Sequence, residues 1–257
     1  MLKPRIIPCL TMDENYDCVN TIKFRERRYI GDILNTVKIF NEKNVDEIII
    51  LDIDSTIKNR MPNFNLIEKL ASVCRMPLCY GGGIKSPEDA IKILKLGVEK
   101  ISLGNAAIED VELIKKITKE VGSQSVAVCI DIKKNKKNNS FEIFTNNGKK
   151  LIDKKLDNFL FEIQDKGVGE IIFNSIDRDG TMNGFYLEIL EKHLSKIGTP
   201  TTIIGGAGNY EDIRNLCKKY KIIGAGCTSI FVYKGIHKAV LINYPSPNDK
   251  QKIFCKD

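Results

Sequence analysis

The sequence has few metal-binding side chains and no long apolar run. It contains two histidines and eight cysteines in 257 residues, with no C-x-x-C pair. Most of the cysteines lie within apolar runs, so we expect reduced core residues rather than metal ligands or disulfides. Every apolar run falls short of the roughly 18 residues needed to cross a bilayer, and the N-terminus leads into a strand rather than a signal peptide. We therefore expect a cytoplasmic protein with no membrane contact, metal or cofactor.

The charge balance is positive but shows no nucleic-acid-binding pattern. The formal charge is +7, and the lysines are scattered along amphipathic stretches without interleaved aromatic residues or a nucleic-acid motif. We interpret this as a solvated lysine-rich surface with no nucleic-acid partner. The same positive balance would help to attract a phosphorylated small-molecule substrate.

The chain repeats itself, and the repeat predicts its fold. Apolar runs bounded by turn residues are typical of buried parallel strands, and here they alternate with helical patterns. Matching stretches pair the two halves of the chain: Ile6–Thr11 with Val126–Asp131, Val45–Ser55 with Val168–Thr181, and Pro77–Ala107 with Pro200–Ser229. Two similar halves of this kind indicate an α/β fold, a (β/α)8 TIM barrel.

The length fits one such barrel, and no linker supports a division into two domains. We expect a single domain over residues 1–257, with half-barrels at about 1–123 and 124–245 and a loose tail over 246–257. The long polar segment Thr11–Gly31 is predicted to be a mobile lid. FEIFT, between two polar stretches within Ile132–Lys150, predicts a small hairpin, and one helix is expected over about Glu109–Val121.

Catalytic groups of such barrels come from the C-terminal ends of the strands. Asp131 ends an apolar strand there, where desolvation can raise a carboxyl pKa, so it is the best acid/base candidate. The alternative is an aspartate that caps the adjacent turn. Its counterpart in the other half is Thr11, which cannot act as a general acid at neutral pH. Asp177 and Asp179 could cap a turn or bind substrate hydroxyls.

A glycine cluster follows a strand in each half, at Gly81–Gly83 and Gly205–Gly208. Glycines allow a phosphate to approach backbone N–H groups, and the next helix N-terminus adds a favourable dipole. Two such sites would suit a substrate with a phosphate at each end. The alternative is that the glycines only turn the chain.

Charged residues also mark the other ends of the strands. Arg5, Glu47, Lys100 and Glu170 lie at or near the starts of four strands. Two positive and two negative side chains could form a ring of salt bridges across the bottom of the barrel. The alternative is a set of ordinary charges at strand ends.

Several motifs occur in a family-specific order: RIIPCL at Arg5–Leu10, GGGI at Gly81–Ile84, CID ending at Asp131, NSIDRDGT at Asn174–Thr181 and GGAG at Gly205–Gly208. Jointly they resemble the cyclase subunit of imidazole glycerol phosphate synthase, HisF, over nearly the whole chain. The resemblance implies a barrel that receives ammonia through its core from a HisH-like glutaminase at its N-terminal face. The family joins this ammonia to a bis-phosphorylated aminoimidazole ribonucleotide and closes the imidazole ring, using two aspartates.

The resemblance also implies roles for particular residues. Asp131 matches one catalytic aspartate, whereas Thr11 stands at the position of the other and Asn20 at that of a family lysine; Asp13 could substitute for the missing carboxylate. The ring residues Arg5, Glu47, Lys100 and Glu170 match the family's ammonia gate. The first phosphate site is matched by Gly83, Gly104 and Asn105, and the second by Asp179, Gly180, Gly206, Thr228 and Ser229.

Longer matches, including VNTIKF at Val19–Phe24 and HKAVLINYPS at His237–Ser246, are similar to a HisF-like branch associated with surface-glycan biosynthesis. Members of that branch are thought to pass ammonia, with a HisH-like glutaminase, to an amidotransferase that forms an amidino group on an N-acetyl sugar. We favour this branch. Two alternatives remain: a histidine-pathway cyclase in which Asp13 or Asp179 replaces the missing aspartate, and a non-catalytic scaffold that only conducts ammonia.

Overall fold

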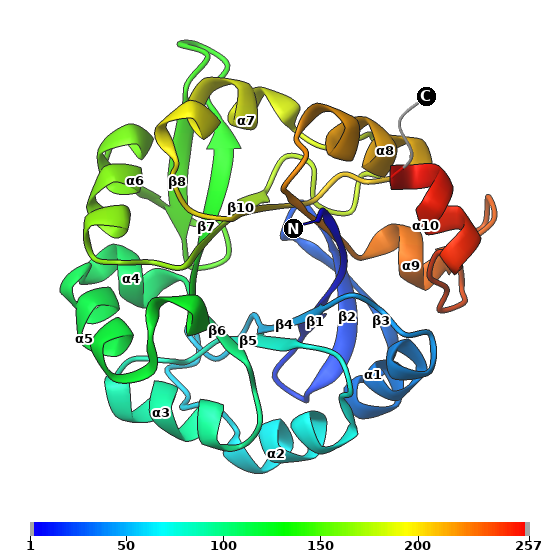
Figure 1. The fold of residues 1–257 in the computed structure, drawn as a ribbon, viewed down its shortest axis with the longest axis horizontal. Coiled ribbons are helices and arrows are strands. Elements are labelled where there is room, and N and C mark those ends of the chain that lie inside the picture. The colour runs from blue at the N-terminus through cyan, green and yellow to red at the C-terminus, as the bar shows by residue number, and fades with distance from the viewer. Residues whose placement is uncertain (1–2, 255–257) are drawn as a thin grey trace.

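The computed structural model describes residues 3–254, and its centre is a closed barrel of parallel strands (Figure 1). Each strand pairs in parallel with its two neighbours, and pairing between β7 and β10 and between β12 and β1 completes the circle. The predicted (β/α)8 barrel is therefore confirmed. In order around the barrel the strands are β1 (Arg5–Met12), β4 (Ile48–Asp52), β5 (Leu78–Gly81), β6 (Lys100–Leu103), β7 (Val126–Lys134), β10 (Glu170–Ser175), β11 (Thr201–Ile204) and β12 (Gly224–Cys227).

Helices surround this barrel (Figure 1). Some of them begin at side-chain caps: Asp32 accepts from the Asn35 N–H, and Ser86 and Asp89 form a capping box. Most of the barrel is covered by α1 (Ile33–Glu42), α2 (Phe64–Val73), α3 (Pro87–Lys95), α4 (Asn105–Glu109), α5 (Glu112–Val121), α6 (Leu156–Asp165), α7 (Leu187–His193), α8 (Tyr210–Lys219) and α9 (Ser229–Val232). Short 3₁₀ turns occur at η1 (Ser123–Ser125) and η2 (Leu194–Lys196).

The helix expected over about Glu109–Val121 is confirmed as α5, which begins at Glu112, three residues later than expected. The short α4 that precedes it was not expected. Asp110 lies between them with an extended backbone, at φ −138° and ψ 97°. Its carboxylate accepts a hydrogen bond from the Glu112 N–H at 2.9 Å. This local bond competes with helix continuation and starts the second helix.

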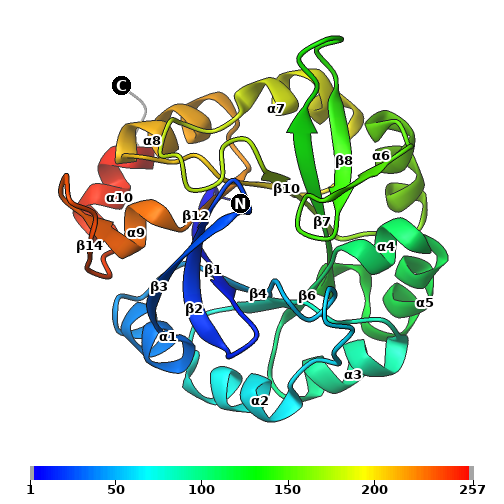
Figure 2. The same cartoon turned by 180° about the vertical axis from the view of Figure 1, so that it is seen from behind.

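Two hairpins extend the barrel sheet. The one predicted around FEIFT is confirmed as β8 (Phe141–Thr145) and β9 (Lys150–Ile152), which continue from β7. The first polar segment, expected to be a mobile lid, contains a hairpin of β2 (Asp17–Ile22) and β3 (Glu26–Asp32), which continues from β1 (Figure 2). Strand pairing is favoured there because Cys18 of β2 and Ile30 of β3 pack into the core.

The C-terminal segment forms a helix, so the expectation of a loose tail is wrong for the described part. A small hairpin, β13 (Tyr233–Lys234) and β14 (Ala239–Val240), precedes α10 (Pro247–Phe254), which packs against α8. Tyr244 donates a hydrogen bond to the Ile6 carbonyl at 2.7 Å. Residues 255–257, with Cys255, lie outside the described residues.

The core has two parts. A large cluster fills the space between strands and helices, and a smaller one lies inside the barrel. The described cysteines are free thiols, and all of them except Cys74 are buried, which confirms that most of them are core residues. Within residues 3–254, no helix is long and apolar enough to cross a membrane. The inner cluster comprises Ile7, Cys9, Ile49, Cys79, Ala127, Cys129, Ile172 and Ile204.

Candidate functional site

A cavity of about 460 Å³ opens at the C-terminal ends of the barrel strands. Its walls come from both halves of the chain, with Thr11 from β1, Gly81 from β5 and Asp131 from β7. Thr21 and Phe24 of the first hairpin segment also line it. Active sites of eightfold barrels lie at this face, so the cavity is the candidate active site.

Asp131 is the central titratable group of this cavity. Burial raises the pKa of its carboxyl to about 7, the Asn174 hydrogen bond opposes the rise, and the negative charge of Asp179 adds to it. Asn174 of β10 donates through Nδ2 to Oδ1 of Asp131 at 2.9 Å, because the two residues are paired across the strands. A carboxyl with a pKa near neutrality can both accept and release a proton, as general acid–base catalysis requires.

The positions of the missing aspartate and of its candidate substitute differ. Thr11 lines the cavity, but its hydroxyl donates to the Val19 carbonyl at 2.6 Å and so ties β1 to the hairpin. Asp13 is not among the residues that line the cavity. Its carboxylate accepts instead from the N–H groups of Asn15 and Asp17, at 2.9 and 3.1 Å. Asp13 therefore does not supply a second carboxylate to the cavity.

The residues assigned to the first phosphate site come together. Gly83, Gly104 and Asn105 all line the cavity on the side of β5 and β6. Gly83 has φ +73°, and a Cβ there would lie 2.9 Å from the Arg60 carbonyl oxygen, so only glycine fits. Lys85 and Lys116 line the same side, although the sequence reasoning did not single them out.

The residues assigned to the second phosphate site are divided. Asp179 and Thr228 line the cavity, whereas Gly180, Gly206 and Ser229 do not. The Asp179 carboxylate accepts from the Thr21 hydroxyl at 2.7 Å and from the Phe24 N–H at 3.0 Å. Burial raises the pKa of Asp179 to about 6, although these two hydrogen bonds oppose the rise.

Asp177 makes a structural contact at the end of the barrel strands. Its carboxylate accepts a hydrogen bond from the Lys134 N–H at 2.9 Å. Lys134 ends β7, so Asp177 ties the loop after β10 to the neighbouring strand. It does not line the cavity.

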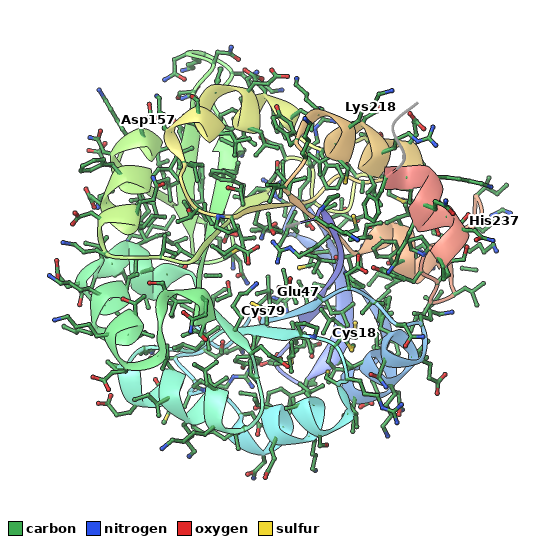
Figure 3. All side chains as sticks on the ribbon, viewed as in Figure 1. Cys18, Glu47, Cys79, Asp157, Lys218 and His237 are labelled. Atoms are coloured by element: carbon green, nitrogen blue, oxygen red, sulfur yellow. The ribbon has the colours of Figure 1, made fainter. Side chains whose placement is uncertain are left out.

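At the opposite end of the barrel, the four predicted charged residues form a closed ring of alternating sign. Arg5 contacts Glu47, and its Nη2 lies 2.8 Å from Glu170. Lys100 closes the ring at 2.9 Å from Glu47 and 2.5 Å from Glu170. In Figure 3, Glu47 lies close to the barrel axis and Asp157 at the periphery. The ring therefore spans the axis at the N-terminal ends of the strands.

The two carboxylates of the ring, Glu47 and Glu170, are buried, whereas Arg5 and Lys100 are partly exposed. Although burial opposes ionisation of Glu170, Lys100 and Arg5 lower its pKa to about 2. Thr202 of β11 adds a hydrogen bond from its hydroxyl to Glu170 at 2.5 Å. The sequence reasoning missed Thr202, because a threonine at a strand start has no distinctive spacing.

The barrel interior between ring and cavity is electrically neutral. The inner cluster consists of aliphatic side chains and of the thiols of Cys9, Cys79 and Cys129. Burial raises the pKa of each thiol well above its ordinary value, so all three stay protonated. Cys9 and Cys129 also line the cavity, and Cys79 lies near the axis in Figure 3.

Comparison with known proteins identifies the family. Residues 5–238 match the model of the family described as "Histidine biosynthesis protein". A Leptospira borgpetersenii protein, provisionally named imidazole glycerol phosphate synthase subunit HisF, is 51% identical over 254 residues, 99% of this chain and 100% of the relative. A provisionally named second HisF of Pseudomonas aeruginosa is 43% identical over 96% of this chain and 98% of the relative.

The chain is also similar to a protein of Natranaerobius thermophilus that is named imidazole glycerol phosphate synthase subunit HisF without a provisional label. It is 34% identical over 246 residues, which cover 96% of this chain and 97% of the relative. Matches of this extent, on a barrel with Asp131 in its cavity, show common descent. The chain belongs to the histidine biosynthesis protein family, as a member of its HisF group.

Proposed function

We propose that this chain is the synthase subunit of a glutamine amidotransferase complex. It would receive ammonia from a HisH-like glutaminase at the N-terminal face and use it in the cavity around Asp131. The native acceptor would be an N-acetyl sugar of a surface glycan, with an amidotransferase as a further partner. One observation carries the proposal: the salt-bridge ring and the Asp131 cavity lie at opposite ends of one neutral barrel interior.

The interior favours passage of ammonia as the neutral molecule. Transfer of an ammonium ion into an apolar interior is costly, whereas neutral ammonia avoids most of this cost. The protonated thiols of Cys9, Cys79 and Cys129 offer no negative charge that would hold an ammonium ion. Arg5 or Lys100 would have to move aside to open the ring, and a partner docked at that face could provide the competing contacts.

Asp131 would then manage the proton of the reaction. Ammonia adds to the amide carbon of the N-acetyl group: a C–N bond forms while the electrons of the C=O π bond move to oxygen, and the nitrogen passes a proton to the Asp131 carboxylate. The protonated Asp131 returns this proton to the oxygen, which leaves as water and so gives the amidino group. Asn174 holds the carboxylate in place through its 2.9 Å hydrogen bond. Gly83, Asn105 and Lys116 would hold the anionic group of the substrate on the β5–β6 side.

The second candidate is an imidazole glycerol phosphate synthase cyclase of histidine biosynthesis. Asp131 and the first phosphate side of the cavity favour it, and so do the names of the relatives. Thr11 argues against it, because loss of one of two proton-transfer groups typically costs on the order of a hundredfold in rate. The third candidate, a scaffold that conducts ammonia without catalysis, does not account for the raised pKa of Asp131.

The deciding experiment measures imidazole glycerol phosphate formed from the bis-phosphorylated precursor and ammonium at alkaline pH. We expect no turnover by the unaltered chain and measurable turnover by Thr11→Asp, which restores the second carboxylate in an intact barrel. Turnover by the unaltered chain would make it a histidine-pathway cyclase.

A second measurement follows glutamine hydrolysis by a HisH-like glutaminase with and without this chain. Stimulation by the unaltered chain, together with amidination that Asp131→Asn abolishes, would support the proposed synthase. Stimulation and amidination that both survive Asp131→Asn would identify the non-catalytic scaffold.

A further inference from the structure

The C-terminal segment reaches back to the strands that carry the salt-bridge ring. We propose that Tyr244 is a positioning residue for this ring: its hydroxyl is inserted between β1 and β4 and sets how Arg5 meets Glu47. Tyr244 acts through the backbones of Ile6, which follows Arg5, and Asp46, which precedes Glu47. The inference deepens the proposed function and rests on it, because ammonia would have to pass this ring.

In the second half of the chain, a direct backbone bond joins the two strands beside the ring. The internal repeat sets Val126 of β7 against Ile6 of β1, and Gly169, just before β10, against Asp46. The Gly169 N–H donates to the Val126 carbonyl at 2.9 Å. The pairing of β7 with β10 extends down to Glu170. The strand ladder itself therefore holds this ring residue in place.

In the first half, the Tyr244 hydroxyl stands where the second half has that direct bond. The Asp46 N–H donates to the Tyr244 hydroxyl at 3.2 Å, and this hydroxyl donates to the Ile6 carbonyl at 2.7 Å. The pairing of β1 with β4 begins only at Cys9 and Ile49, farther from the ring. Since side chains join the two strands at the level of the ring, their spacing there depends on Tyr244.

The Asp46 carboxylate completes this bridge. Its Oδ2 accepts from the Ile6 N–H at 3.0 Å, and its Oδ1 lies 2.6 Å from Nζ of Lys250 in α10. The same ammonium group lies over the Tyr244 ring, 4.6 Å from the ring centroid. Ile6 is fully buried, so its backbone groups need these partners. The C-terminal segment thus holds both side chains that bind the Ile6 backbone.

Tyr244 is itself fixed in position. Its ring packs against that of Phe231, with 5.3 Å between the centroids, and the preceding Asn243 N–H donates to the Phe231 carbonyl at 2.8 Å. Burial raises the pKa of the Tyr244 hydroxyl far above its ordinary value, so the hydroxyl keeps the proton that it donates. A neutral hydroxyl can donate and accept at the same time, as this bridge requires.

The bridge bears on one contact of the ring in particular. On its other side, β1 is held by the backbone, because the Arg5 N–H donates to the Ile223 carbonyl at 3.0 Å and pairing with β12 begins at Arg5. Only the spacing between β1 and β4 is set by side chains at this level. Loss of the Tyr244 hydroxyl should therefore loosen the contact between Arg5 and Glu47, while the ladder still holds Glu170.

Side-chain NMR of the full chain tests this inference through the Arg5 guanidinium, whose signal is assigned by its loss in Arg5→Lys. Tyr244→Phe removes the hydroxyl and keeps the aromatic ring. We expect exchange of the Arg5 Nη hydrogens with water to accelerate about tenfold, because a lost hydrogen bond makes local opening easier. Amide exchange at Gly169, the donor of the corresponding bond in the second half, should change by less than about twofold.

Tyr80→Phe is the matched control. Tyr80 is fully buried, and its hydroxyl has no hydrogen-bond partner among the described residues. This variant should leave the Arg5 exchange rate unchanged. An unchanged Arg5 rate in Tyr244→Phe would overturn the inference. Equal acceleration at Arg5 and at the Gly169 amide would overturn it too, since it would indicate a general loss of stability.

A second variant tests the bridge if Tyr244→Phe does not fold. Lys250→Met removes the ammonium group that holds the Asp46 carboxylate and should accelerate Arg5 exchange by about threefold, since a charge-assisted contact is lost. Lys252→Met, at an exposed position of the same helix, is its control. Equal Arg5 rates in these two variants would then overturn the inference.

The glutaminase assay keeps the two proposals apart. If Tyr244→Phe accelerates Arg5 exchange but the unaltered chain does not stimulate the glutaminase, the proposed function is refuted and the positioning role stands. If the unaltered chain stimulates the glutaminase but Tyr244→Phe leaves Arg5 exchange unchanged, only the positioning role is refuted.

Discussion

At the residue scale, the raised pKa of the Asp131 carboxyl comes from its surroundings. Its place at the end of an apolar strand predicted a raised pKa, and the structure places that pKa at about 7. Asn174 could not be predicted in the same way. Its contact with Asp131 depends on the register between β7 and β10, which separate segments of sequence do not reveal.

The raised pKa of Asp131 predicts a pH-dependent stability. The folded chain holds this proton more tightly than the unfolded chain, whose pKa is near 3.8. The ionised Asp131 therefore destabilises the folded state above pH 7. The free energy of unfolding should fall as pH rises from about 4 to 7. Asp131→Asn should flatten this slope, with an effect at pH 8 of at most about 4 kcal/mol.

Chemical denaturation at pH 5 and pH 8 measures the effect. Asp179, with a pKa of about 6, contributes a slope of the same sign, so the variant should reduce the difference between the two pH values rather than remove it. An unchanged difference in Asp131→Asn would contradict the prediction.

Asn174 is predicted to lower the pKa of Asp131 by stabilising the carboxylate. Asn174→Ala should therefore move that pKa upward by roughly half a unit to one unit, the scale of one hydrogen bond. A pH titration of the Asp131 carboxyl carbon by NMR would show the shift directly. Ser175→Ala is the control, because Ser175 is the next residue of β10 and its hydroxyl has no hydrogen-bond partner among the described residues. Equal pKa values in both variants would exclude this role for Asn174.

At the scale of elements, the barrel strands were predictable and two other segments were not. The prolines near the C-terminus suggested a loose tail, but Pro247 begins α10, and Ser246 and Asp249 cap it reciprocally. The first hairpin was obscured by its polar residues. A signal was available, because β7 matches β1 in the internal repeat and a hairpin was expected after β7. The same repeat could have predicted the β2–β3 hairpin after β1.

The Arg27–Asp54 ion pair is predicted to hold the β2–β3 hairpin on the barrel. Asp54→Asn should weaken the two charge-assisted hydrogen bonds and raise the rate of amide exchange in β2 and β3 by about tenfold. Hydrogen exchange read by mass spectrometry tests this. Glu14→Gln is the control, because it breaks an exposed ion pair with Lys58 in the same region. The same increase in both variants would show that Asp54 has no special part.

At the scale of the whole molecule, the internal repeat predicted the barrel and the four ring residues predicted a salt-bridge network. The second phosphate site stays a prediction, and the contacts around it could not be foreseen. Gly180 and Ser229 stand at the expected positions, but contacts with a hairpin far away in sequence, at Thr21 and Asn20, cover them. Such contacts depend on tertiary packing, which local motifs do not encode.

The ring should stabilise the fold only as a complete set. Glu170→Gln would leave Arg5 and Lys100 sharing Glu47, and removal of one partner from a buried ionic network typically costs about 3–5 kcal/mol. We expect a loss below this range, since Arg5 is partly exposed. Thr202→Val, which removes a hydrogen bond to Glu170 but no charge, should cost less. Free energies of unfolding compare the two, and equal losses would argue against a cooperative ring.

The same ring has a consequence for association kinetics. Its two cations and two anions cancel, and the lowered pKa of Glu170 preserves this balance through the neutral range. Four cancelling charges produce little field beyond about one Debye length, roughly 8 Å at physiological ionic strength. A protein that docks over the ring would therefore experience little long-range attraction from it. Screening of the ring by added salt would hardly change the association rate.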